Sequence, residues 1–107
     1  MAEEVLLIVT TWPNAEAAQT ASRQLVEEKL IACANILPGV ESIYRWQGKV
    51  ETSPEVMVLM KTSIGRYPQV EARIHALHSY ELPEIIAFRA SDGLPAYLRW
   101  VEESCLE

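Results

Sequence analysis

"ACANILPGVESIYRW" (residues 32–46) leads through Gln47-Gly48 directly into "KVETSPEVMVLMKT" (residues 49–62). Two long extended segments separated by two residues, the second of them glycine, predict a β-hairpin with a tight turn. Inside the first segment, Pro38-Gly39 predicts a bend or a bulge. A second interruption is expected near Ser53-Pro54. The hairpin is therefore expected to be long, with a tip that extends beyond the rest of the fold.

The segments outside the hairpin complete one αβ domain over residues 1–107. Residues 5–12, "VLLIVTTW", predict a buried strand, and Asn14 is expected to cap a helix that runs to about Lys29. A second helix is expected from about Tyr67 with a buried stripe of Val70, Ile74 and Leu77, and "EIIAFRA" (residues 84–90) predicts a fourth strand. The last helix follows, with Leu94, Leu98, Val101 and Cys105 expected on its inner face. This order predicts an α+β, ferredoxin-like βαββαβ sandwich with an additional C-terminal helix.

Composition excludes several classes of protein. A net charge of −6 argues against a nucleic-acid partner, which needs a basic face. The first residues lack a basic n-region, and no apolar run reaches the ~20 residues of a membrane span, so we expect a cytoplasmic protein with no membrane partner. The two cysteines, Cys33 and Cys105, do not form a CxxC pair and are expected to be free thiols. No GxSxG, glycine-rich phosphate loop or HExxH is present, so we expect no enzyme activity.

Three of the expected strands are apolar on both faces. "VLLIV", "VMVLM" and "IIAF" show none of the alternation expected for a sheet with one face in water. The helices predicted here do not easily cover both faces of a four-stranded sheet. We therefore expect the second face to pack against other copies of the chain, with Tyr44 and Trp46 of the hairpin as aromatic anchors. The alternative is a curled hairpin that folds back onto its own sheet.

Four segments resemble the CutA family of divalent-cation tolerance proteins. They are "LIACANILPGVESIYRWQGKVE" (residues 30–51), "VLMKT" (58–62), "HSYELPEI" (78–85) and "YLRW" (97–100), and they occur in the order expected for that family. The resemblance implies a ferredoxin-like fold and a compact homotrimer in which hairpins wrap neighbouring subunits. It also implies a role in tolerance to copper and other divalent cations. The architecture is similar to that of the trimeric PII-like signal-transduction proteins of nitrogen regulation.

The family pattern falls on positions spread along the whole chain. This sequence departs from it at Ser79, where many members have proline. It also has Thr10 and Thr11 rather than a cysteine in the first strand, and Leu77 rather than a second histidine before His78. The matching positions are Cys33, Tyr44, Trp46, Lys61, His78, Tyr80, Pro83, Glu84 and Trp100.

The candidate metal ligands are His78, Cys33, Glu81 and Glu84. A neutral imidazole suits copper and zinc, and Glu81 and Glu84 can supply oxygen ligands or orient the imidazole. His78 and Cys33 also have structural interpretations, His78 as a helix cap and Cys33 as a small buried hydrophobe. Cys105 is expected to pack, and His75, three residues before His78, is expected to lie on the surface.

Lys61 ends the most apolar strand, where an ammonium must reach water or a carboxylate. With Tyr80 and Trp46 it is a candidate for lining a cleft between subunits that holds an anion or a small metabolite. The alternative is a structural ion pair at the interface, with Glu81 and Glu84 as possible partners. Two functions follow from these residues. One is a homotrimer that binds divalent cations, copper among them, and the other is a PII-like signalling or scaffold module that binds a metabolite. A purely structural trimer is a third alternative.

Overall fold

The computed structural model describes residues 4–106, and its elements follow the predicted order. The strands are β1 (Val5–Trp12), β2 (Cys33–Trp46), β3 (Lys49–Ser63) and β4 (Ile85–Arg89). The helices are α1 (Ala15–Glu27), α2 (Tyr67–Leu77) and α3 (Pro95–Ser104). The strands form one antiparallel sheet in the order β2-β3-β1-β4, so β2 and β4 are its edges. The α+β, ferredoxin-like arrangement with an added C-terminal helix is confirmed.

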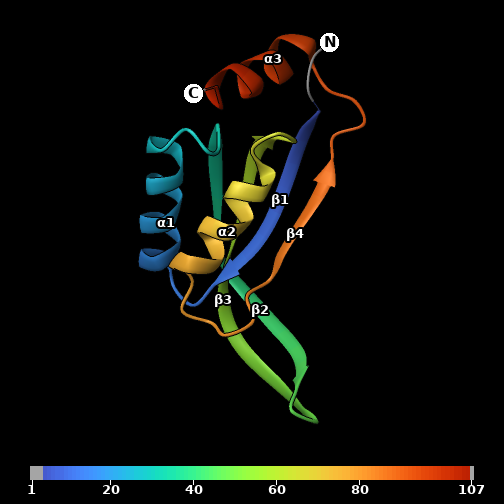
Figure 1. Ribbon diagram of the computed structural model, residues 1–107. Coiled ribbons are helices and arrows are strands. Elements are labelled where there is room, and N and C mark those ends of the chain that lie inside the picture. The colour runs from blue at the N-terminus through green and yellow to red at the C-terminus, as the bar shows by residue number, and fades with distance from the viewer. Residues whose placement is uncertain (1–3, 107) are drawn as a thin grey trace.

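Helices α1 and α2 lie side by side on one face of the sheet, and α3 lies at the end of the sheet away from the hairpin tip (Figure 1). Beneath α1 and α2 lies the main core, which includes Ile8, Leu25, Met60 and Ile74. A smaller cluster, built on Val5, Ala32, Val101 and Cys105, holds α3. Leu94, predicted on the inner face of this helix, is 70% exposed instead, because it precedes Pro95 and lies outside the helix.

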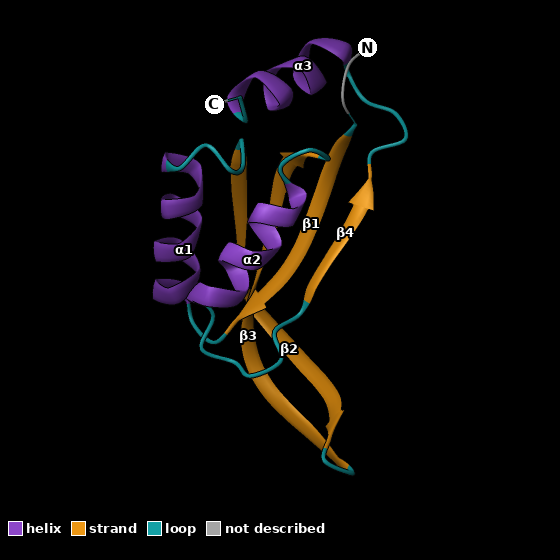
Figure 2. Cartoon of the chain, viewed as in Figure 1, coloured by secondary structure: helices purple, strands orange, loops and turns teal. Residues whose placement is uncertain are grey.

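The hairpin has the predicted bulge and turn. The register between β2 and β3 shifts between Leu37 and Val40, where Gly39 has a φ of 79°. Gln47 and Gly48 both have positive φ, at 51° and 81°, as a type I′ hairpin turn requires. The arm projects well beyond the helices (Figure 2), and the molecule measures 47 × 26 × 23 Å.

Two boundaries differ from the sequence predictions. Strand β3 continues without a break through Ser53 and Pro54, because this part of β3 pairs only with β2 and a proline is tolerated where one edge is free. Helix α1 ends at Glu27 rather than at Lys29. Lys29 has a φ of 61°, its N–H bonds to the Val26 carbonyl, and the next N–H bonds to the Leu25 carbonyl. This pattern is the Schellman motif, which ends the helix in a left-handed residue.

The second face of the sheet is not covered by α1 or α2, and α3 contacts only its end through Tyr97 and Cys33 (Figure 1), so we call it the open face. Alternate residues of all four strands point to it, in three rows that cross the sheet. Its side chains are largely apolar, and Leu37, Ile86 and Phe88 are 41%, 47% and 54% exposed. The prediction that the helices leave one apolar face uncovered is confirmed. The rows consist of Phe88, Leu7, Lys61 and Cys33; Ile86, Val9, Leu59 and Asn35; and Thr11, Met57 and Leu37.

Candidate functional site

His78 ends α2 and is buried at the corner where the chain turns toward β4. It is the C-cap residue, with extended backbone dihedrals, and its side chain is 8% exposed. Its Nε2 lies 2.7 Å from the Thr11 carbonyl oxygen, and its Nδ1 accepts a hydrogen bond of 3.1 Å from the backbone N–H of Tyr80. A carbonyl only accepts, so these two contacts fix a neutral imidazole with its proton on Nε2. Both ring nitrogens are thus already in use, which leaves neither free for a metal in this conformation.

An aromatic stack surrounds this imidazole. The Trp12 ring lies 4.1 Å from it at an interplanar angle of 23°, and the Tyr80 ring lies 4.5 Å away at 45°. The Tyr80 hydroxyl donates a 2.8 Å hydrogen bond to Glu55 on β3. Burial, followed by this bond to a carboxylate, raises the pKa of Tyr80 to about 12. The corner therefore ties the end of α2 to β1 and to the root of the hairpin.

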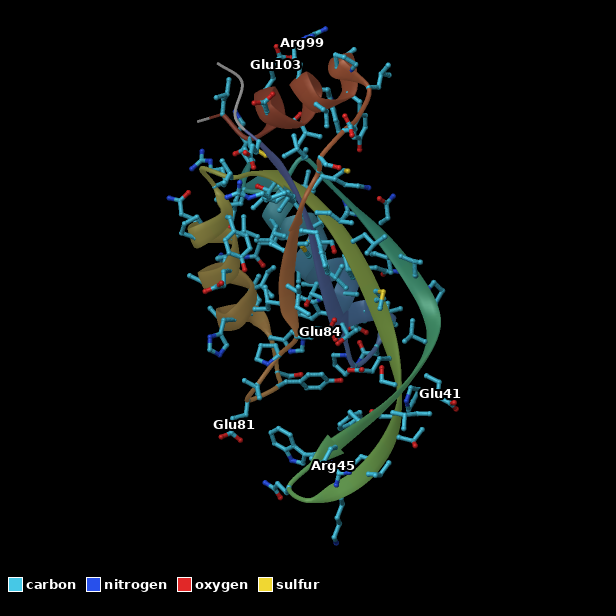
Figure 3. All side chains as sticks on the ribbon, turned by 90° about the vertical axis from the view of Figure 1, so that its right-hand side faces the viewer. Glu41, Arg45, Glu81, Glu84, Arg99 and Glu103 are labelled. Atoms are coloured by element: carbon cyan, nitrogen blue, oxygen red, sulfur yellow. The ribbon has the colours of Figure 1, made fainter. Side chains whose placement is uncertain are left out.

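Glu81 and Glu84 lie on the connection between α2 and β4, beside the hairpin arm that carries Arg45 (Figure 3). Both are exposed, and neither forms an ion pair or side-chain hydrogen bond within residues 4–106. Lys61 therefore forms no ion pair with either glutamate inside a single described chain, and the ion pair predicted at an interface between copies stays a prediction. Two free carboxylates three residues apart provide oxygen atoms that a divalent cation can bind.

Cys33 lies at the opposite end of the sheet. It pairs in register with Lys61, whereas Trp12, which stacks on His78, pairs with Val56. Five residues of β3 separate these two points, roughly 17 Å at the usual rise of a strand. Cys33 and His78 are therefore not joined in one chain, and no group of three His, Cys, Asp or Glu side chains among the described residues is arranged to hold a metal ion.

Cys33 takes part in a polar cluster at the α3 end of the open face. It is half-buried, and its Sγ lies 3.6 Å from the Tyr97 hydroxyl on α3. That contact with the thiol, followed by burial, raises the pKa of Tyr97. Lys61, directly across from Cys33, donates from Nζ to the side-chain oxygen of Asn35. We call these four residues (Cys33, Asn35, Lys61 and Tyr97) the Lys61 cluster.

The three residues predicted to line one cleft do not meet within a single chain. Lys61 lies six residues along β3 from Glu55, which holds Tyr80, a separation of roughly 20 Å. Trp46 is at the far end of the hairpin, paired with Lys49 and 40% exposed. Lys61, Tyr80 and Trp46 therefore share a cleft only where different copies of the chain come together.

The sequence predictions missed several partners of these residues. Trp12 and Glu55 hold the His78 corner, and Asn35 and Tyr97 belong to the Lys61 cluster. Strand alternation does place Asn35 and Lys61 on one face, so their pairing was accessible once the register was known. The contact between Cys33 and Tyr97 joins residues 64 positions apart, and no sequence spacing indicates it.

Comparison with known proteins identifies the family. The family model described as "CutA1 divalent ion tolerance protein" matches residues 6–104. The chain belongs to the CutA1 family. Among curated CutA1 relatives, the divalent-cation tolerance protein CutA of Thermus thermophilus is 47% identical over 102 residues, which cover 95% of this chain and 97% of that protein. The chloroplastic CutA of Arabidopsis thaliana is 37% identical over 92% of this chain, which spans only 54% of that longer relative.

Solved CutA1 structures share the fold at high similarity. The Thermus thermophilus structure has a TM-score of 0.92 and 43% sequence identity, and it covers 94% of this chain and 97% of that one. CutA1 from Oryza sativa has a TM-score of 0.95 and 36% identity, covering 99% and 97% of the two chains. Within residues 4–106, every helix is too short or too polar to cross a bilayer.

Proposed function

We propose that this CutA1 protein binds divalent cations, copper among them, as a cytoplasmic homotrimer, and thereby contributes to tolerance of those ions. The observation that carries the proposal is the family match over residues 6–104 to a divalent ion tolerance protein. The Thermus thermophilus relative, with 47% identity, carries the same function in its name. The exposed carboxylates of Glu81 and Glu84 are oxygen ligands of the kind that divalent cations bind, so binding rather than catalysis is the proposed activity.

The homotrimer is proposed from the open face and the two sheet edges. Exposed Phe88, Ile86 and Leu37 lie on one continuous apolar surface, and surfaces of this kind usually mark an interface. The edges, β2 and β4, are different surfaces of the same sheet. Contact between unlike surfaces closes into a ring when the rotation permits, and three copies form the smallest ring with such contacts. Sedimentation equilibrium over a wide dilution series tests this; a folded monomer at all concentrations contradicts it.

The proposed cation ligands begin with Glu81 and Glu84. Both carboxylates are exposed and unpaired in the described chain, so a cation does not have to break an existing bond to reach them. One chain supplies too few ligands for a closed site, whereas three copies pool them. His78 joins such a site only by giving up the hydrogen bond that Nδ1 accepts from Tyr80. Cys33 lies at the other end of the sheet, directly across from Lys61, whose ammonium disfavours a cation at the soft thiolate, so Cys33 is the weakest of the predicted ligands.

Calorimetric titration with Cu²⁺ and Zn²⁺ tests the ligand set. The Glu81→Gln/Glu84→Gln double variant is expected to weaken binding at least about tenfold, because it removes both oxygen donors. Glu16→Gln/Glu27→Gln is the matched control, since it removes the same charge from exposed positions of α1. His78→Ala and Cys33→Ser test the two remaining candidate cation ligands. His75→Ala is the control, because His75 is an exposed imidazole. Affinities equal to wild type in all variants would exclude these four residues as cation ligands.

The cytoplasm is the proposed compartment. Both cysteines are free thiols in the structure, as is usual in a reducing environment. CutA relatives are also named as chloroplastic in Arabidopsis thaliana and as periplasmic in Archaeoglobus fulgidus. Fractionation of source cells followed by immunodetection tests the assignment, and recovery of the protein outside the cytosolic fraction contradicts it.

A second candidate function, binding of a small anionic metabolite as in a PII-like module, is favoured by one observation. Lys61 is the only charged residue in the three rows of the open face, and it has no carboxylate partner among residues 4–106. A metabolite that raises the melting temperature in metal-free buffer would support this function.

A further inference from the structure

Lys61 stands in an apolar environment that sets it apart from the other lysines. Its neighbours across the sheet are Leu7 on one side and Cys33 on the other, and the next row along the strands begins with Ile86 and Val9. The side chain is half-buried in the single chain. If the open face is covered by another copy, this ammonium loses its remaining water. An isolated buried ammonium is very costly, so a covered Lys61 requires an anion.

The neighbours of Lys61 are arranged as hydrogen-bond donors. Because the Asn35 side-chain oxygen accepts from Lys61 Nζ, the amide nitrogen of Asn35 is left with its N–H groups as donors. Asn35 is exposed, so those donors are accessible. Tyr97 adds a hydroxyl beside the Cys33 thiol, and the pKa of Tyr97 is raised, so this group keeps its proton. One cation and two neutral donor groups lie together at the α3 end of the open face.

The charge of this cluster selects against a metal cation. Residues directly opposite in an antiparallel pair have Cβ atoms about 4.5–5.5 Å apart, so Lys61 lies next to Cys33. A divalent cation held by the Cys33 thiolate would face the ammonium at close range, which raises its energy. The same ammonium attracts an anion. A lysine point charge with an amide and a hydroxyl suits a carboxylate, which needs fewer donors than a phosphate group.

We propose that Lys61, Asn35 and Tyr97 form a carboxylate-binding site on the open face, separate from the cation ligands at Glu81 and Glu84. This inference rests on the proposed homotrimer in one respect only, which is that another copy of the chain covers the site. The carboxylate has two sources, a free small molecule or a glutamate of a neighbouring copy. Both satisfy the same chemistry, and the experiment separates them.

The experiment uses the full chain, Lys61→Met, and the control Lys49→Met, which removes an exposed lysine at the hairpin tip. Succinate is added in metal-free buffer with chloride adjusted to constant ionic strength, and the melting temperature and sedimentation are recorded. Methionine keeps the length of the stem and removes the charge, and Lys61→Arg restores the charge.

If the carboxylate is a small molecule, succinate raises the melting temperature of wild type and Lys49→Met in a saturable way but not that of Lys61→Met. If it comes from a neighbouring copy, succinate has no effect. In that case Lys61→Met raises the concentration at which the assembly dissociates at least about tenfold, and Lys61→Arg reverses most of the change.

The proposal is overturned if succinate leaves the melting temperature of wild type unchanged and Lys61→Met assembles as wild type does. A wild type that is monomeric at every concentration has a different meaning. It refutes the homotrimer, and the succinate response alone then decides whether the Lys61 cluster is a carboxylate site.

Discussion

His78 offers the sharpest test of how the corner is held together. His78→Ala removes the hydrogen bond to the Thr11 carbonyl, the acceptor for the Tyr80 N–H, and the stack on Trp12. Two buried hydrogen bonds contribute about 1 kcal/mol each, and an aromatic pair contributes about 0.5–1.5 kcal/mol. The expected loss in the free energy of unfolding is therefore about 3 kcal/mol.

A second substitution separates the contributions. In His78→Asn, the side-chain oxygen can accept from the N–H two residues on, as asparagine does in an Asx turn. This variant keeps the contact with Tyr80 and loses the one with Thr11, so its loss should be about 1 kcal/mol smaller than that of the alanine variant. His75→Ala is the control, because His75 is exposed three residues earlier on the same helix.

Urea denaturation at one fixed protein concentration measures these differences, since the stability of an oligomer depends on concentration. The reasoning is refuted if His78→Ala lies within about 0.5 kcal/mol of wild type, the range of ordinary surface substitutions. It is also refuted if His75→Ala costs as much as His78→Ala.

Three further predictions concern assembly, the end of α1, and pH. Phe88→Glu places a charge on the open face and should dissociate the assembly, as measured by sedimentation. The control Val26→Glu places the same charge on the outside of α1, at a residue that is 40% exposed, and should leave the assembly intact. Equal sedimentation of the two variants would argue against the open face as the interface. Lys29→Gly should stabilise the protein by about 0.5–1 kcal/mol in urea denaturation, because Lys29 has a φ of 61° and glycine adopts this conformation without strain. A loss of stability would contradict this explanation of the end of α1. The pKa values of Tyr67 and Tyr80 are raised from 10.0 to about 12 in the folded protein, mainly by burial, so the folded state binds more protons than the unfolded state between these values. Stability from these two groups is complete below pH 10 and is lost as pH rises toward 12. Absorbance of phenolate at 295 nm should show tyrosines that titrate late, and Tyr67→Phe/Tyr80→Phe should lose two of them, while Tyr97, whose pKa is also raised, remains.

Local patterns in the sequence were sufficient to predict the strands and helices. The apolar run of residues 5–12 and the helical spacing of Val70 and Ile74 predicted β1 and α2, because side-chain periodicity follows directly from backbone geometry. The hairpin turn at Gln47-Gly48 was predicted despite the unfavoured first residue. The end of α1 was missed, because Lys29 adopts the left-handed conformation that glycine usually supplies.

The sequence by itself determined the order of the strands and helices, the surplus of apolar surface and the family, since each depends on residues close together in the chain or on a motif. Only the tertiary structure decided what the chemistry-bearing residues touch. Register and the packing of the corner commit both nitrogens of His78 to backbone groups, place Cys33 with Tyr97 at the other end of the sheet, and leave Lys61 without a counter-charge within the described residues. Those contacts join segments from distant parts of the chain, and their geometry follows from how the sheet, helices and loops pack together rather than from any local spacing.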